Sequence, residues 1–551
     1  MTVNEAHEPP PGPAITPSAQ VSIVIIAFND AVHVGDAVRS ALAQETPGAA
    51  VAEVIAVNDA STDGTGATLD ALARTEPRLR VIHRDENSGG CGTPRNDGLR
   101  AATGRFVMFL DSDDVLPPGA VRALLGAALV HDAPVAAGAC VRRELPAHRD
   151  VPWQPELYAE PAVYDSPEAI AALLRDTLCV NKLYERSFLV KHDISFPDGR
   201  YTYEDFVFTA QVLAAAPRIV TVPDSVYIWH VRRSAAKQSI SLDRKDVANW
   251  QARIEAHRAS VRIFLEAGQQ ALADAAATKF LDHDLRMYVR ELHTRSADYR
   301  AEWWRLTREY LAGFDEAAVR AAGAPGRWAA RVVLASPAPR DLDRLTQLAA
   351  RPARLLPPYA EAEGRAVWSA DLPGVELEGL DAGPLSRLPV TVDAEPAVGT
   401  RGALRLRLHD LYGRLAAAGP ESIDVELRRR RDDRRGPVHT AALTPVPAGS
   451  GPAVCWTAEV ILDIAALAAP GSGPADPEAW DVTVRIGFAD GSGIRTAPRA
   501  VGPGLGRRVL PSRQHAVLLV QPYATTGGAL ALRVAAGLRS LWRIAARRLR
   551  R

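Results

Sequence analysis

The sequence has few of the residues that build disulfide frameworks or zinc clusters. Its 551 residues include four cysteines, which are far apart and form no C-x-x-C pair: Cys91, Cys140, Cys179 and Cys455. Neither a zinc site nor a disulfide framework is therefore expected, and a reducing compartment is the simplest setting. A run of about 18 apolar residues is also missing, which argues against a membrane-spanning helix.

Net charge is missing as well, because 65 basic residues balance 65 acidic ones. A nucleic-acid-binding domain usually carries a basic excess, so no nucleic-acid partner is expected. The first 20 residues are rich in proline and lack a basic stretch followed by an apolar one. This pattern predicts a disordered N-terminus and no signal peptide, and together these absences favour a cytoplasmic protein.

Patterns of buried strands alternate with helical patterns in the first part of the chain. The segments Val21–Phe28, Ala52–Ala60 and Arg105–Asp114 are apolar runs that suit parallel strands buried on both faces. Helical patterns lie between them. This alternation predicts an α/β domain with a doubly wound, mostly parallel sheet over residues 21–245.

Polar residues follow each of these predicted strands directly. Asn29, Asp59 and the acidic group that begins at Asp111 stand at the three strand ends. In doubly wound sheets the ligand binds at the carboxyl ends of the strands, which lie at one edge. We therefore expect these side chains to share one ligand-binding edge.

The third strand ends in Asp111, Ser112, Asp113 and Asp114. Clustered carboxylates repel one another unless a cation or solvent neutralises them. Mg²⁺ and Mn²⁺ are typically held by one or two carboxylates together with substrate phosphates. The cluster therefore predicts a site for Mn²⁺ or Mg²⁺; the alternative is an acidic turn that caps the next helix.

Asp59 and Arg95 are candidates for binding a nucleotide. Asp59, within VNDASTDGT, is placed to accept hydrogen bonds from a base, whereas Asp63 and Thr65 suit a turn and a helix cap. Arg95, within NSGGCGTPRNDG, stands near a predicted helix N-terminus, where it could reach a phosphate or the base. The alternative for the glycines of this segment is a flexible loop.

Four residues further along suit catalysis and phosphate binding. Glu204 and Asp205 begin a predicted helix, where the helix dipole favours anions, so capping competes with catalysis. The functional interpretation makes Asp205 a general base for an acceptor hydroxyl. Near a diphosphate, His230 would be a metal ligand and Arg232 a phosphate clamp, although a structural histidine and a solvated arginine are the alternatives.

The residue pattern changes twice in the rest of the chain. Residues 246–355 have helical periodicity and predict a helical linker domain, and residues 356–525 have short alternating runs that predict a β-sandwich region. Residues 526–551 contain many arginines and no acid, which predicts a basic amphipathic helix. Such a helix would lie on a membrane surface or pack on a neighbouring domain or subunit.

Six segments in a fixed order resemble glycosyltransferase family 2, whose catalytic domain has the GT-A fold: SIVIIAFN, VNDASTDGT, GGCGTPRNDG, FLDSDD, NKLY and YEDF. The resemblance covers residues 21 to about 241. It implies inverting transfer from a nucleotide-sugar, usually a UDP-sugar, with a divalent metal. It also implies an enzyme whose acceptor is a glycan or another hydroxylated polymer.

The same resemblance assigns roles to residues. The carboxylate of Asp59 would contact the uracil, and Asp205, with Glu204 beside it, would be the catalytic base. The remaining donor-site residues implied are Ala27, Phe28, Asn29, Arg95, Asp111, Ser112 and Arg232. The implied metal ligands are Asp111, Asp113 and His230.

Longer segments are similar to the teichoic-acid sugar transferases of Gram-positive bacteria: NKLYERSFL, FPDGRYTYEDFVF and YIWHVRRSAAKQSIS. This similarity implies transfer of GlcNAc or another hexose to a hydroxyl of a cell-envelope polymer such as teichoic acid. It also implies a homo-oligomer that assembles through the β region. A peripheral position at the inner face of the cell membrane, through the C-terminal helix, would follow.

Two other functions are compatible with the same patterns. A nucleotidyl- or phosphotransferase on a similar sheet would need a phosphate-gripping lysine loop, for which only Lys182 and Lys191 are suitably placed. A non-catalytic GT-A scaffold in envelope assembly would not need the acids at Asp59, Asp111 and Asp205.

Overall fold

The computed structural model divides the chain into two compact units, Met1–Phe280 and Leu281–Arg551. It describes residues 21–44, 51–146, 148–232, 244–397, 402–446, 455–468, 478–512 and 514–536. The proline-rich segment before Val21 lies outside these ranges.

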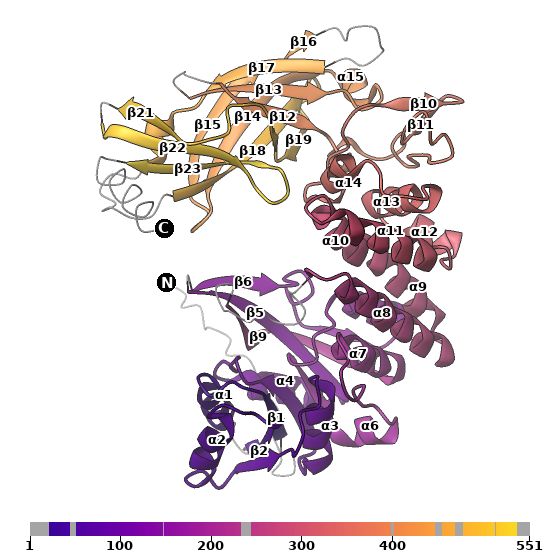
Figure 1. Cartoon of the computed structure of the whole chain (residues 1–551), viewed down its shortest axis with the longest axis vertical. Coiled ribbons are helices and arrows are strands. Elements are labelled where there is room, and N and C mark those ends of the chain that lie inside the picture. The colour runs from indigo at the N-terminus through magenta and orange to yellow at the C-terminus, as the bar shows by residue number, and fades with distance from the viewer. Residues whose placement is uncertain are drawn as a thin grey trace, which may run out of the picture. The chain divides into compact units, whose positions relative to one another are not determined.

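The first unit is built on a mixed sheet in the strand order β3-β2-β1-β4-β8-β5-β9-β7, with β6 paired to β5 (Figure 1). Its strands are β1 (Val21–Ala27), β2 (Val51–Asn58), β3 (Leu79–His83), β4 (Phe106–Asp111), β5 (Val135–Leu145), β6 (Arg149–Trp153), β7 (Ala162–Tyr164), β8 (Lys182–Glu185) and β9 (Ile219–Arg232). The three strands predicted from apolar runs are β1, β2 and β4, which confirms the α/β fold class.

The sheet is parallel only in parts. β3, β2, β1 and β4 run parallel, as predicted, and so do β5 and β9. However, β8 is antiparallel to both of its neighbours, β4 and β5. The mostly parallel half therefore contains the predicted nucleotide-binding strand ends, and the mixed half adds the long strand β9 beside them.

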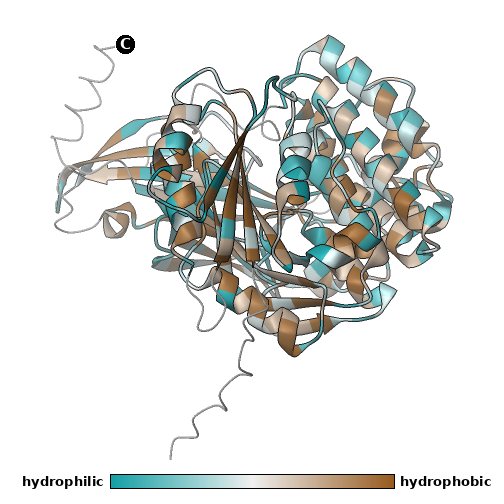
Figure 2. Ribbon diagram, turned by 90° about the horizontal axis from the view of Figure 1, so that it is seen from below, coloured by the Kyte–Doolittle hydropathy of each residue, from teal (hydrophilic) through white to brown (hydrophobic). Residues whose placement is uncertain are grey.

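Helices cover this sheet: α1 (Val34–Leu42), α2 (Thr65–Ala73), α3 (Gly92–Ala101), α4 (Ala120–Val130), α5 (Pro167–Ile170), α6 (Arg186–Lys191), α7 (Glu204–Ala215), α8 (Ala248–Glu266) and α9 (Gln270–Lys279). Every residue of β1 is buried, because a strand covered on both faces has no solvent-exposed side. Figure 2 shows the contrast between mostly hydrophobic strands and helices that carry both hydrophilic and hydrophobic residues.

Two helices that the sequence places in the linker belong to the first unit. The unit extends to Phe280, and residues of α8 and α9, including Phe264 and Leu272, join the same hydrophobic core as the sheet. The Arg253 guanidinium of α8 lies 4.7 Å from the ring centre of Tyr203 and 4.8 Å from that of Phe206. The first unit therefore ends at Phe280 and not at the predicted residue 245, because α8 packs on α7.

The second unit begins with helices and continues with sheets. The helices are α10 (Arg286–Leu292), α11 (Ala297–Leu311), α12 (Glu316–Ala321), α13 (Ala324–Ala335) and α14 (Leu342–Ala349), followed by a small hairpin of β10 (Ala360–Ala362) and β11 (Arg365–Val367). Within the ranges that the structure describes, none of the helices combines the length and hydrophobicity needed to cross a membrane.

The strands of the second unit form two sheets around one core. One sheet has the order β16-β17-β13-β12-β20, and the other has the order β15-β14-β18-β23-β22-β21, with β19 paired to β18. Their strands are β12 (Val392–Pro396), β13 (Ala403–His409), β14 (Pro420–Arg429), β15 (Arg435–Ala442), β16 (Thr444–Val446), β17 (Cys455–Ile461), β18 (Glu478–Phe488), β19 (Gly493–Thr496), β20 (Arg499–Ala500), β21 (Arg508–Ser512), β22 (Ala516–Ala524) and β23 (Leu530–Ala536), with the short helices α15 (Arg414–Ala418) and α16 (Ile464–Leu467). A single hydrophobic cluster contains residues of both sheets, which is the arrangement of a β-sandwich.

The predicted C-terminal helix is wrong at its start. Residues Leu530–Ala536 form β23, which pairs with both β22 and β18. The apolar residues of this segment fit one face of a helix and one face of a strand equally well. The segment forms a strand because β18 and β22 each offer an edge with which it can pair. The β region thus extends to Ala536, and the arginine-rich residues after it lie outside the described ranges.

Candidate active site

The strand register brings the predicted site residues to one edge of the first sheet. Ala27 lies opposite Asn58, and Ile26 lies opposite Asp111. The residues that follow β1, β2 and β4 therefore leave the sheet at the same level. This confirms that the predicted strand-end residues share an edge, as expected for parallel strands.

Arg95 links two of the predicted acids. Its guanidinium donates to Asp111 Oδ1 at 2.7 Å and to Glu204 Oε1 at 2.6 Å, and the residue is only 4% exposed. These two ion pairs connect α3, β4 and the first turn of α7. The structure therefore shows Arg95 holding carboxylates in place, and a contact with the donor stays a prediction.

The glycine-rich segment packs tightly against the chain that leads into α7. A Cβ atom at Gly92 would lie 2.2 Å from the carbonyl oxygen of Pro197, so only glycine fits there. Asn96 donates to the carbonyl oxygen of Phe196 at 2.8 Å and accepts its N–H at 2.9 Å. The predicted glycine loop thus serves to dock α3 against the approach to Glu204 and Asp205.

Tyr203 stands directly before α7 in a left-handed conformation, with φ of 67°. A bulky residue rarely adopts this conformation, and such strain persists only where the surroundings impose it. The Tyr203 hydroxyl donates to Asn249 Oδ1 at 2.9 Å, which ties the turn to α8. Because the chain changes direction at Tyr203, α7 begins at Glu204, and both Glu204 and Asp205 lie in its first helical turn.

Asp205 has the electrostatics of a general base. Its carboxylate makes no hydrogen bond or ion pair with any of the described residues, and it is partly buried. Burial and the negative charge of Glu204 raise the pKa of Asp205 to about 7, against the opposing effects of Arg95 and Arg253. A carboxylate of this kind is available and basic near neutral pH.

The acidic segment after β4 is held by the end of β9. The Tyr227 hydroxyl donates to Asp114 Oδ2 at 2.7 Å and accepts the N–H of Asp111 at 3.3 Å. The backbone N–H of His230 donates to Asp114 Oδ1 at 2.7 Å. Burial, and then the charges of Asp113 and Asp111, raise the pKa of Asp114 well above its ordinary value. Asp114 therefore anchors the segment that carries the other two acids.

His230 and Arg232 both contact Asp113. The Arg232 guanidinium donates to the Asp113 carbonyl oxygen at 3.1 Å and to Oδ2 at 3.2 Å. His230 Nδ1 lies 3.0 Å from the same carbonyl oxygen, a contact that requires the proton on Nδ1 and leaves the lone pair on Nε2. Burial lowers the pKa of His230, which keeps the ring neutral. The histidine is thus in the form that binds metal ions.

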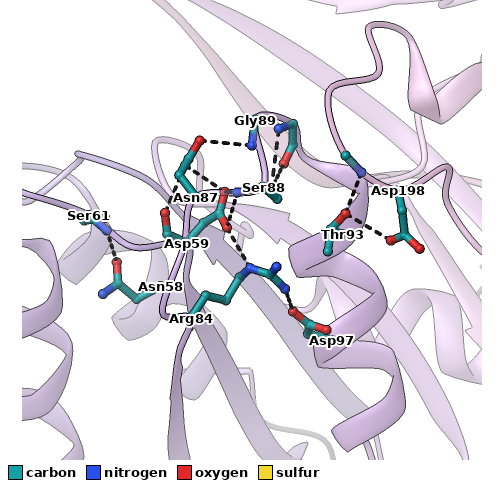
Figure 3. A network of polar contacts seen from close by, with 12 residues as sticks. Asn58, Asp59, Ser61, Arg84, Asn87, Ser88, Gly89, Thr93, Asp97 and Asp198 are labelled. Atoms are coloured by element: carbon teal, nitrogen blue, oxygen red, sulfur yellow. Dashed lines mark hydrogen bonds and ion pairs between the residues drawn. The ribbon is translucent and has the colours of Figure 1, made fainter.

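Asp59 is buried and surrounded by donors (Figure 3). Its carboxylate accepts the N–H of Ser88 at 3.0 Å, the Ser88 hydroxyl at 2.8 Å and Asn87 Nδ2 at 2.9 Å. Arg84 Nε lies 2.9 Å from Asp59 Oδ1. A nucleobase would have to share or replace one of these contacts, so the predicted role of Asp59 depends on the movement of the segment from Asn87 to Gly89.

The loop after β1 carries the remaining donor-site candidates. Ala27 is buried as the last residue of the strand, whereas Phe28 and Asn29 are exposed. Asn29 Oδ1 accepts the N–H of Thr62 at 2.7 Å, so the loops after β1 and β2 are joined. An exposed aromatic ring beside an exposed amide suits a surface on which a nucleotide lies.

Ser112 is joined to a residue that the sequence analysis missed. Its hydroxyl donates to Asp30 Oδ2 at 2.8 Å, and Asp30 Oδ1 lies 2.6 Å from His33 Nδ1. Tyr227 was missed as well. Asp30 could have been predicted, because it directly follows Asn29 after the end of β1. The neighbouring sequence gave no indication of Tyr227, because its partner Asp114 is 113 residues away in the chain.

The acids fit a divalent cation that is shared with a substrate. Asp111 Oδ2 and Asp113 Oδ1 have no partner residue in the described part of the chain, and partial burial and the charge of Asp111 raise the pKa of Asp113 to about 6. A cation would relieve this excess of negative charge. Within the described ranges no three His, Cys, Asp or Glu side chains are grouped so that they could hold a metal, so the predicted ligands Asp111, Asp113 and His230 do not form a preassembled site.

Comparisons with known proteins give the following similarities. The model of the family "Glycosyl transferase family 2" matches residues 22–186. The succinoglycan biosynthesis protein ExoO of Rhizobium meliloti is 31% identical over 243 residues, which are 42% of this chain and 67% of ExoO. The poly(ribitol-phosphate) beta-N-acetylglucosaminyltransferase TarS of Staphylococcus aureus is 30% identical over 220 residues, which are 40% of this chain and 36% of TarS.

Two further similarities extend beyond the family match. The poly(ribitol-phosphate) beta-glucosyltransferase of Bacillus spizizenii is 26% identical over 301 residues, 54% of this chain and 46% of that protein. The crystal structure of S. aureus TarS aligns with 94% of this chain and 85% of that chain, with a TM-score of 0.52 and 17% identity, which shows similarity of fold alone. The chain thus spans two thirds of ExoO and less than half of the two poly(ribitol-phosphate) transferases in sequence.

Proposed function

The chain belongs to glycosyltransferase family 2, and on that premise we propose that it moves a sugar from a UDP-sugar to a hydroxyl group of a cell-envelope polymer such as a teichoic acid. The sugar would be GlcNAc or another hexose. The names of the poly(ribitol-phosphate) relatives support the acceptor class, and the name of TarS supports GlcNAc. The observation that carries the proposal is an Asp205 carboxylate with a raised pKa and no hydrogen bond or ion pair to the described residues, directly beside Glu204, which Arg95 joins to Asp111 at the end of β4.

The proposed reaction is a single displacement. Asp205 takes the proton of the acceptor hydroxyl, whose oxygen forms a bond to the anomeric carbon of the sugar. The bond between that carbon and the phosphate oxygen breaks on the opposite side, and the nucleoside diphosphate leaves with the electron pair. The configuration at the anomeric carbon is thereby inverted.

The other residues of the site bind and orient. Asp111, Asp113 and His230 Nε2 would hold Mn²⁺ or Mg²⁺, which would offset the charge on the diphosphate when bound. Arg232 lies beside Asp113, where its guanidinium is placed to receive a phosphate oxygen. Arg95 joins Glu204 and Asp111 and would keep both carboxylates in fixed positions during the reaction. Phe28, Asn29 and Asp59 would line the nucleoside.

The test separates binding from chemistry. Asp205→Asn should lower the transfer rate by about 10²–10⁴-fold, which is the usual contribution of a general base, and should leave the dissociation constant of the UDP-sugar within about twofold. Calorimetric titration with UDP-GlcNAc in the presence and absence of Mn²⁺ measures the second quantity. Equal losses of donor binding and turnover would remove Asp205 from the role of base.

Metal dependence has its own control. Asp113→Asn should weaken donor binding in the presence of Mn²⁺ and leave the weaker, metal-free binding unchanged. If donor binding by the unaltered chain does not depend on the metal, the assignment of Asp111, Asp113 and His230 as ligands is wrong.

A further inference from the structure

An arginine-rich turn projects from the second unit, far along the chain from the active-site motifs. The segment 428–435, which we name the arginine hairpin, has the sequence RRRRDDRR and joins β14 to β15 (Figure 1). Its residues from Arg430 to Arg435 are all exposed. None of them is apolar, so the turn cannot be explained by packing into a core.

Half of these arginines are already paired. Arg428 contacts Asp433 at 2.7 Å, Arg429 contacts Glu478 at 2.8 Å as well as Asp432, and Arg430 contacts Asp481. These ion pairs fix the hairpin to β18. They engage Asp432, Asp433, Glu478 and Asp481.

The other half are available for a ligand. Arg431, Arg434 and Arg435 form no ion pair with any described residue, and Arg434 rests over the Trp480 ring at 5.8 Å. Flexible cations that stand together without carboxylate partners among the described residues gain little for folding, because like charges repel. Their arrangement therefore points to an external anion that offsets the repulsion.

The basic surface continues from the hairpin onto the outer face of the sheet. Arg428 is opposite Arg435, and Arg533 of β23 lies on the same face, opposite Ala479 and Gln521. The Arg533 guanidinium lies 4.5 Å from the centre of the Tyr523 ring. Asp481 and Ala479 of β18 lie between Arg428 and Arg533 on this face, so the guanidinium groups are spread over several strands and do not form a single pocket.

We propose that the arginine hairpin and Arg533 form a second, non-catalytic binding surface for an anionic glycopolymer, a flexible hydroxylated chain with phosphate groups at intervals. Guanidinium groups bind phosphate oxygens through paired donors, and a series of them suits a polymer with repeated charges. The half-buried Tyr523 ring, over which the Arg533 guanidinium lies, borders this surface. The identity of the polymer as the acceptor rests on the proposed function, whereas the anionic character of the ligand rests on the hairpin alone.

Other anionic partners fit less well. A membrane-binding turn would carry apolar side chains for insertion, and the residues from Arg430 to Arg435 include none. A nucleic-acid surface would be expected to give its chain a basic excess, whereas this chain has no net charge. A second binding surface on the same chain would raise the effective concentration of the polymer for the catalytic unit.

The test measures binding without any donor sugar. The full chain is titrated with a fluorescent ribitol-phosphate polymer of about 20 repeats at 50 mM and 300 mM NaCl. The triple variant Arg431→Ala, Arg434→Ala, Arg435→Ala should bind it about tenfold or more weakly at low salt, and the difference should shrink at high salt. The matched control is Arg262→Ala, Arg320→Ala, Arg405→Ala, which removes three exposed arginines whose ion pairs are long, at 3.9, 3.8 and 3.6 Å, and should stay within twofold.

Catalytic readouts separate this inference from the proposed function. The hairpin variant should raise the KM for the long polymer and leave kcat with an acceptor of one or two repeats unchanged. Equal effects of the two triple variants, binding of neutral dextran as tight as that of the polymer, or tighter hairpin-dependent binding of phosphatidylserine vesicles or of a single-stranded oligonucleotide would each overturn the inference. Hairpin-dependent polymer binding in a chain that transfers no sugar from any UDP-sugar would instead overturn the proposed function alone.

Discussion

The charged groups of the active-site edge in the first unit and those of the β-sandwich surface in the second unit lie in different surroundings. In the first, a few charged groups are buried and coupled at one sheet edge, as Arg95 is between Asp111 and Glu204. In the second, many charged groups lie on the outer faces of strands in exposed cross-strand pairs, such as Arg430 with Asp481 and Arg495 with Glu426. The first arrangement fixes the geometry of a few atoms, and the second covers a broad surface.

The difference shows that the free-energy cost of a charged group depends on whether the group is buried. A buried charge must be paired or it destabilises the fold, so the buried acids of the first unit report a function that offsets their cost. Exposed pairs cost little and contribute little, so their presence in the second unit carries no such message. There the arginines Arg431, Arg434 and Arg435 are informative, because they form no ion pair with the described residues.

The largest expected change in stability follows from removing the buried ion pairs of Arg95 with Asp111 and Glu204. Arg95→Met leaves two carboxylates unpaired beside each other and should lower the free energy of unfolding of the first unit by about 3–5 kcal/mol, with loss of sugar transfer. The matched change in the second unit is Arg430→Met, for which about 1 kcal/mol or less is expected. Differential scanning calorimetry of the full chain measures both, and similar losses would show that the contrast between the units is false.

A smaller effect is expected where α3 docks against the approach to α7. Asn96→Ala removes both hydrogen bonds to Phe196 and should cost about 2 kcal/mol in stability. It should also lower kcat/KM by about tenfold or more, because a displaced α7 misplaces Asp205. Thr440→Ala, which removes one exposed hydrogen bond to Asp424, is the control and should change neither quantity appreciably. Wild-type kcat/KM in Asn96→Ala would mean that this contact does not position the base.

The pH dependence of stability should have opposite signs in the two units. The pKa of Asp205 is raised to about 7, so its ionisation weakens the fold as the pH rises from about 4 to 7. Asp205→Asn should therefore stabilise the chain by about 1 kcal/mol at pH 8 and have little effect at pH 4. The pKa of Asp393 is lowered, because hydrogen bonds from His409 and Arg499 outweigh the effect of its burial.

Asp393→Asn should then destabilise by about 1 kcal/mol at pH 7, and this loss should fade as the pH falls below 4. Urea unfolding of both variants at pH 4 and at pH 7–8 tests the pair. Effects of the same sign at neutral to alkaline pH would contradict the assigned electrostatics of at least one site.

The smallest effect is expected for an exposed pair of the second unit. Arg495→Ala removes an ion pair of 2.9 Å with Glu426 and should change the free energy of unfolding by about 0.5 kcal/mol or less. The change should vanish at 0.5 M NaCl, where the Debye length is only a few ångströms. A larger, salt-insensitive loss would show that the outer face is not a freely solvated surface.

The local sequence pattern was sufficient to predict the central strands of the first unit and the edge of the sheet at which they end. The apolar runs predicted β1, β2 and β4, and the polar residues after them predicted the ligand-binding edge, because parallel strands align their carboxyl ends. Pattern failed at Leu530–Ala536, where alternation fits a helix face and a strand equally well. Only the neighbouring edges of β22 and β18 distinguish the two.

Apolar runs and the residue types at their ends thus determined by themselves that this chain has an α/β domain with acids and an asparagine gathered at one edge of the sheet. The tertiary structure decided which of them are engaged and which are available. It surrounded Asp59 with donors, placed Arg95 between Asp111 and Glu204, and left Asp205 with a raised pKa and no partner among the described residues. The physical reason is that hydrogen bonding and desolvation depend on neighbours from distant segments, which a single sequence does not order in space.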